Sequence, residues 1–101
     1  GDTRIGTGAA AATLTTDGAH DLVLDTNSGT NSGTITITDG AGGNITITPN
    51  GSGNIVLDGL TFPNADGSAD QALLTNGSGT LSFGSAGIST GKAIAMAIVF
   101  G

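Results

Sequence analysis

Apolar and polar residues alternate along short stretches of the chain, with apolar side chains at positions i and i+2 and Thr or Val between them. This period of two is typical of a β-strand with one buried face. The regular couplets begin 13, 10 and 10 residues apart, and they are Leu22/Leu24, Ile35/Ile37, Ile45/Ile47 and Ile55/Leu57. Two further couplets, Leu60/Phe62 and Leu81/Phe83, repeat the pattern after the regular part. The pattern predicts a series of short strands.

Turn signals separate the couplets. Six Asn-Gly or Asp-Gly dipeptides occur, at 17–18, 39–40, 50–51, 58–59, 66–67 and 76–77. Both residues of such a dipeptide tolerate the positive φ angles of tight turns. We therefore expect four of these glycines to hold turn conformations that Ala adopts only at a cost: Gly40, Gly51, Gly59 and Gly77.

The ten-residue spacing predicts an all-β, elongated fibrous β-repeat, either a β-solenoid or an intertwined trimeric β-fibre with short strands. Each repeat offers only two large side chains, whereas three chains around an axis would place six in each layer. A hairpin meander of one chain would have a single thin face, so the trimer is favoured. The side chains predicted to point to the trimer axis are Ile35, Ile37, Ile45, Ile47, Ile55 and Leu57.

Four segments are expected along the chain. They are a flexible entry segment at 1–13, a β-repeat shaft at 14–62, a turn-rich linker with a terminal strand at 63–84, and an apolar interface segment at 85–101. Within the linker, residues 68–74 fit either one helical turn or an extended link. In the last segment, small residues alternate with large ones, which predicts a strand covered on both faces. Its expected assembly contacts are Ile94, Met96, Ile98 and Phe100, closing the oligomer or docking into a neighbouring protein.

The composition indicates that a single copy of the protein would be only marginally stable. Only 24 residues are Leu, Ile, Val, Phe or Met, while 19 are Gly, whose conformational entropy opposes folding. No Cys is present, so disulfides cannot add stability. We expect copies of the protein to stabilise one another.

The charge pattern argues against several partners. The net charge is −6, all eight acidic residues are Asp, and the only cations are Arg4 and Lys92. Without further cations, and with neither Tyr nor Trp, the protein lacks the phosphate contacts and stacking platforms of a nucleic-acid groove. The longest apolar run, 93–100, is too short to cross a bilayer, so no membrane insertion is expected.

Candidate chemistry is sparse. A G-x-G-x-x-A arrangement at 6–11 lacks the helix and second strand of a dinucleotide site, and a loop resembling a phosphate loop at 86–92 is followed by Ala93 instead of a hydroxyl residue. We therefore expect no cofactor. With no Cys, Glu or Tyr, and with no Ser on a strand-to-helix elbow, we also expect no enzyme activity.

His20 is the weak candidate for a metal site. It is the only His and is flanked by Asp17, Asp21 and Asp25. Three copies on a trimer axis could hold a metal. The simpler interpretation is a surface or turn histidine bonded to the backbone, with no metal.

Residues 14–60, from "LTTDGAHDLVLDTNSG" to "NIVLDGL", and residues 65–83, "ADGSADQALLTNGSGTLSF", resemble segments of tail-fibre and related structural proteins of marine tailed bacteriophages, notably those of cyanobacteria. The ordered string "TTDGAHDLVLDTNSGTNSG" carries the most specific part. The resemblance implies a structural virion protein on an outer appendage or on the capsid or tail surface. A homotrimeric fibre shaft, decoration protein or adaptor would have copies of itself and other virion proteins as partners.

Contact of such a virion protein with a host surface is unsupported, because no Trp or Tyr is available to stack on a sugar.

Two functions are alternatives to a virion protein. A cellular adhesin or extracellular filament subunit could use the same β-repeat and would polymerise head to tail without a particle. A carbohydrate-binding or hydrolysing module would need a concave polar site, for which the sequence offers no candidate.

Overall fold

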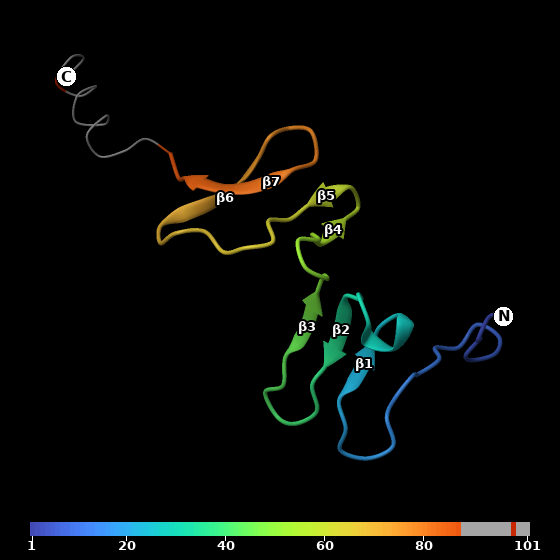
Figure 1. Ribbon diagram of the computed structural model, residues 1–101. Helices are drawn as coiled ribbons and strands as arrows, with labels where there is room; N and C mark the ends of the chain where they lie inside the picture. The colour runs from blue at the N-terminus through green and yellow to red at the C-terminus, as the bar shows by residue number, and fades with distance from the viewer. Residues whose placement is uncertain (88–97, 99–101) are drawn as a thin grey trace. The chain divides into compact units, whose positions relative to one another are not determined.

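The computed structural model describes residues 1–87 and 98 of the 101-residue protein (Figure 1). The all-β class is confirmed: short antiparallel strands form small sheets, and the described residues contain one named helical element, the 3-10 turn η1 (Asn27–Gly29). The polypeptide divides into two units, Gly1–Asn50 and Gly51–Gly101.

The first unit contains one three-stranded antiparallel sheet in the order β1-β2-β3 (Figure 1). Its strands are β1 (Leu22–Leu24), β2 (Thr34–Ile37) and β3 (Ile45–Thr48). The alternating Ile and Thr residues of β2 and β3 are β-branched, which favours extended backbone. Residues 1–13 contain no strand.

The loop between β1 and β2 is held by its own polar side chains. The Ser32 hydroxyl accepts a hydrogen bond from the Thr26 amide at 2.8 Å and one from the Thr26 hydroxyl at 3.0 Å. Between these two residues, Asn27 and Ser28 have φ near 50°, a left-handed conformation stabilised here in a tight turn. The loop is therefore closed at its base, close to the ends of the two strands.

The second unit contains two hairpins. Their strands are β4 (Val56–Leu57) with β5 (Leu60–Thr61), and β6 (Gln71–Thr75) with β7 (Leu81–Ser85). The β4–β5 turn has φ of 48° at Asp58 and 82° at Gly59, the pair of positive angles that a two-residue type I′ hairpin requires. The Phe62 amide extends this hairpin by donating to the Ile55 carbonyl at 2.9 Å.

Backbone bonds also join the two hairpins of this unit. Thr61 lies beside Thr80 in a parallel bridge, and the Thr61 amide donates to the Gly79 carbonyl at 2.7 Å. Gly79 is closely approached, because a Cβ there would lie 2.8 Å from the Gly59 carbonyl oxygen. The turn of the short hairpin is thus placed against the turn of the long one.

The four glycines predicted to hold turns all lie in the left-handed region. Their φ angles are 106° at Gly40, 55° at Gly51, 82° at Gly59 and 78° at Gly77. None has another atom within 4 Å of the position that a Cβ would take. The backbone angle, rather than crowding, therefore makes a larger residue costly at these positions.

Two features differ from the sequence-based expectations. Within each sheet, strands that follow one another along the chain pair antiparallel, so residues 1–87 form hairpins and contain no solenoid coil. The shaft bounds 14–62 stay a prediction, and the division into two units falls at 50/51. In the linker the helical alternative for 68–74 is wrong, since its last four residues belong to β6.

The β4–β5 turn provides a local test of the left-handed glycine. Gly59→Ala should destabilise the hairpin by about 1–2 kcal/mol, because an L-residue is disfavoured at φ of 82°. Amide hydrogen exchange of Phe62 should then accelerate by roughly tenfold. Asp58→Asn is the matched control, since Asn also tolerates a positive φ. Unchanged Phe62 exchange in Gly59→Ala would contradict the turn assignment.

Candidate functional site

Six large apolar side chains share one face of the sheet β1–β2–β3. The register aligns Leu22 with Ile37 and then Ile45, and it aligns Leu24 with Ile35 and then Ile47. Directly paired residues of antiparallel strands project to the same side, as do alternate residues of one strand. We call this set the apolar face, and its members are Leu22, Leu24, Ile35, Ile37, Ile45 and Ile47.

The apolar face is largely uncovered within the protein. Ile45 is 70% exposed and Ile47 is 49% exposed; five of the six side chains are exposed, and Leu22 alone is half-buried. No side chain among the described residues is fully buried. A contiguous exposed apolar surface of this kind is typical of an interaction site.

The energy available from covering this face is large for a small protein. Full burial of a Leu or Ile side chain contributes about 1.5–3 kcal/mol, and these side chains are already roughly half shielded. Covering all six would therefore contribute roughly 5–9 kcal/mol per copy. Since a typical folded domain has a net stability of about 5–15 kcal/mol, this burial would change its stability decisively.

The opposite face of the same sheet is polar. Two Thr pairs cross it, Thr34 with Thr48 and Thr36 with Thr46, and Val23 is its only large apolar residue. Thr hydroxyls can stay hydrated, and Thr pairs across strands are stabilising. The sheet is therefore amphipathic, and only one of its faces needs a partner.

Two residues predicted for the same core lie elsewhere. Ile55 and Leu57 belong to the second unit, where Leu57 pairs with Leu60 and the Ile55 carbonyl accepts from Phe62. Only Leu57 of the two lies in a strand, since β4 begins at Val56. The structure does not bring them together with the four Ile residues of the first unit into a single sheet.

Leu22 and Leu24 were absent from the predicted core set, although they complete the apolar face. The sequence does carry their signal, because they form a couplet with the same period of two. Their interval to the next couplet is longer, and η1 with its closing loop accounts for that length.

The β6–β7 hairpin has a smaller apolar side. Leu73 pairs with Phe83, and Leu81 lies on the same side two residues away. A Cβ at Gly67 would lie 2.6 Å from the Phe83 ring, so this glycine allows the backbone to pass closely over the ring. Phe83 is consequently partly covered by its own unit, and it is 37% exposed.

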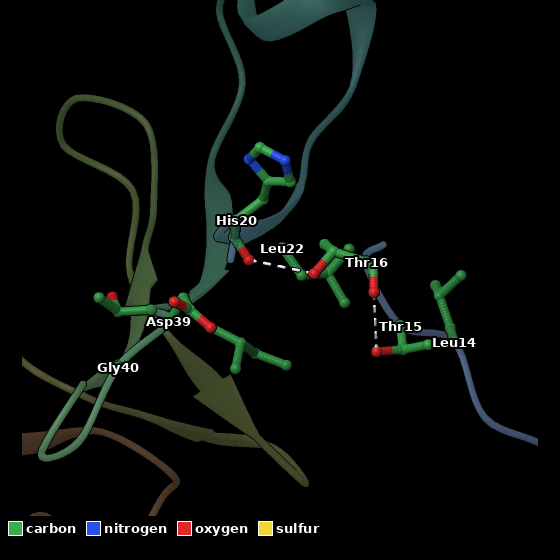
Figure 2. Close-up of a pocket in the computed structure, with 9 residues that line it drawn as sticks. Leu14, Thr15, Thr16, His20, Leu22, Asp39 and Gly40 are labelled. Carbon is green, nitrogen blue, oxygen red and sulfur yellow. Dashed lines mark hydrogen bonds between the residues drawn. The ribbon is translucent and has the colours of Figure 1, made fainter. Parts of the chain in front are cut away.

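His20 lines an open depression of about 270 Å³ at the end of the apolar face nearest the β2–β3 loop (Figure 2). Its amide donates to the Gly18 carbonyl at 3.0 Å, and its carbonyl accepts from the Thr16 hydroxyl at 3.2 Å. In Figure 2 its imidazole points away from Leu14 and Thr15. The backbone of His20 is thus held in a turn, while these hydrogen bonds leave the ring itself unengaged.

The Asp residues near His20 do not form a metal site within one copy of the protein. The Asp21 carboxylate instead accepts a hydrogen bond from the Asp39 amide at 2.9 Å, linking the start of β1 to the β2–β3 loop. Over residues 1–87 and 98, no group of three or more His, Cys, Asp or Glu residues could hold a metal ion. A site made by three His20 residues from different copies stays a prediction.

The predicted C-terminal contacts fall mainly outside the described residues. Ile94, Met96 and Phe100 are not among them, and Ile98 is 78% exposed. In the part of the protein that the structure describes, no helix is both long and apolar enough to cross a membrane.

No family model matches this sequence, and no curated protein or solved structure is significantly similar to it. The apolar face and its register are therefore the features on which a function can be argued.

The register of the apolar face can be tested at the β2–β3 loop. A Cβ at Gly43 would press against the Thr38 carbonyl oxygen, and the Thr38 amide pairs with the Asn44 carbonyl at 3.0 Å. Gly43→Ala should therefore cost about 1–3 kcal/mol through crowding and weaken the pairing of Ile37 with Ile45. Cross-strand nuclear Overhauser effects between these two residues should weaken or disappear.

Gly42→Asn is the matched control for this loop. Gly42 has φ of 75° with open space around it, and Asn tolerates that conformation. The control should keep the Ile37–Ile45 contacts. If Gly43→Ala keeps them equally well, the close approach of the loop does not hold the register.

Proposed function

We propose that this protein is a structural subunit of a tailed-bacteriophage virion, a homotrimeric fibre shaft, decoration protein or adaptor. The observation that carries the proposal is the uncovered apolar face of β1–β2–β3. Three copies pack these faces around a shared axis. The resemblance of residues 14–60 and 65–83 to phage fibre segments supports the virion setting.

The width of the sheet suits three copies. Packed sheets lie about 10 Å apart, so a sheet whose inner side chains meet on an axis lies about 5 Å from that axis. Three such sheets close a triangle with sides of roughly 17 Å, and three strands that each occupy about 4.8 Å of width cover roughly 14 Å. A three-stranded sheet thus forms one side of a small triangular prism with little gap at the corners.

The other features fit a structural role. Asp residues occupy turns, as at Asp58, and a net charge of −6 opposes nonspecific aggregation of the assembled particle. In this proposal the Thr face points outward into solvent. Ile94, Met96, Ile98 and Phe100 provide the contact to a neighbouring virion protein.

A filament subunit of a cellular adhesin is the second candidate, and the sheet edges favour it. β1 and β3 each pair with β2 alone, so each has one open edge within the described residues. Pairing of one copy's β1 with the next copy's β3 would give an open head-to-tail filament. Packing of apolar faces around an axis gives a closed assembly instead.

Substitutions on the two faces test the proposed packing. Ile35→Thr with Ile47→Thr removes one cross-strand apolar pair from every copy and keeps β-branched side chains. Light scattering coupled to size exclusion should show a trimer for the unchanged protein and a monomer for this variant. Val23→Thr, on the opposite face, is the control and should remain a trimer. A trimer that survives the double substitution would overturn the role of the apolar face.

A concentration series separates the trimer from the filament. The molar mass of a closed assembly should reach a plateau at three copies, because no binding surface remains unused. An open edge-paired filament should instead continue to grow in mass as the concentration rises. A monomer at all concentrations would contradict both proposals.

A further inference from the structure

Two identical Asn-Gly dipeptides, Asn50-Gly51 and Asn76-Gly77, lie in very different surroundings. In this dipeptide the backbone nitrogen of Gly can attack the Asn side-chain amide, because Gly has no Cβ to hinder the approach. The reaction needs a carboxamide that is free to rotate and an amide nitrogen that is free to approach it.

At Asn76 both reacting groups are engaged. Its side-chain oxygen accepts hydrogen bonds from the Ser78 amide at 2.8 Å and the Thr80 amide at 3.1 Å. The Gly77 amide, which would be the nucleophile, donates to the Thr75 hydroxyl at 3.1 Å. The Asn76 amide is also paired with the Thr80 carbonyl at 3.1 Å, which anchors the loop to the β6–β7 hairpin. Reaction at this site requires several hydrogen bonds to break.

At Asn50 neither group is engaged. Among the described residues, none forms a hydrogen bond with the Asn50 side chain or with the Gly51 amide. Asn50 is exposed, and Gly51 has φ of 55° with no other atom within 4 Å of its Cβ position. Neither residue belongs to a strand. The carboxamide can therefore rotate toward the Gly51 nitrogen.

We propose that Asn50 is a site of spontaneous covalent modification, while Asn76 is protected by its turn. The Gly51 nitrogen loses its proton to solvent and bonds to the Asn50 Cγ, and the Cγ–Nδ2 bond breaks with release of ammonia. The product is a succinimide ring. Water then opens the ring at one of two bonds: cleavage between Cγ and the Gly51 nitrogen restores a normal backbone with Asp, and cleavage between the Asn50 carbonyl carbon and that nitrogen leaves an isoaspartyl linkage.

The position of this site gives the reaction a structural consequence. Asn50 is the last residue of the first unit and Gly51 is the first residue of the second. Either product adds one carboxylate, which changes the net charge from −6 to −7 per copy. The isoaspartyl product also adds a methylene to the backbone where the units join. This proposal does not depend on the assembly proposed above.

The test follows both dipeptides in the full-length protein during incubation at mildly alkaline pH and physiological temperature. Peptic peptides are analysed by mass spectrometry, with fragmentation that distinguishes aspartyl from isoaspartyl products. Because several hydrogen bonds must break at Asn76 and none at Asn50, Asn50 should convert at least about tenfold faster than Asn76. In the urea-denatured protein, the two dipeptides should convert at similar rates.

Two variants complete the test. Thr75→Val removes the acceptor of the Gly77 amide and keeps the side-chain shape, so it should accelerate conversion at Asn76 alone. Asn50→Gln should abolish rapid conversion at that site, because the longer side chain forms a less favourable ring. Equal native rates at the two dipeptides would overturn the proposal. Protection of Asn50 in the folded protein relative to the denatured state would overturn it as well.

Discussion

The cross-strand register of β1, β2 and β3 decides which surface the first unit presents. In the observed pairing, Leu and Ile occupy one face while Thr and Val23 occupy the other. A slip of one residue in one strand would place Thr among the Ile side chains and expose Ile among the Thr side chains. The register also places the β2–β3 loop, where Gly43 passes close to Thr38. Any assembly that uses the apolar face depends on this pairing.

The positions of the strands and turns could largely be predicted from the sequence, but the direction in which the strands pair could not. Couplets such as Ile35/Ile37 show that one face of a strand is apolar, and an Asp-Gly turn such as Asp58-Gly59 shows where the backbone reverses. Neither signal distinguishes a parallel coil from an antiparallel hairpin, because alternate residues share a face in both. The spacing led us to expect either a solenoid or an intertwined trimeric fibre, whereas residues 1–87 form antiparallel hairpins.

The grouping of couplets was predictable only in part, for a related reason. Regular spacing placed Ile55 and Leu57 with the earlier Ile residues, yet they belong to the second unit. Spacing along the sequence does not reveal which strands pair, since pairing depends on loop geometry. Leu24 was left out of the predicted core for the same reason. The interval between Leu24 and Ile35 is longer than the regular spacing, because a closed loop with left-handed residues lies between them. The predicted C-terminal contacts lie largely outside the described residues.

No side chain among the described residues is fully buried, so hydrogen bonds from polar side chains to the backbone help to hold the loops in place. The Asn54 side chain donates to the Phe62 carbonyl at 2.7 Å, and the Asn64 side chain donates to the Ser52 carbonyl at 3.1 Å. The same kind of bonding shapes the β1–β2 loop, which Thr26 and Ser32 close at its base. Strands β1 and β2 both lie outside this closed loop, so residues 27–31 take no part in the pairing of the sheet. That segment is consequently a natural point for displaying an inserted peptide, with the register of the sheet preserved beneath it.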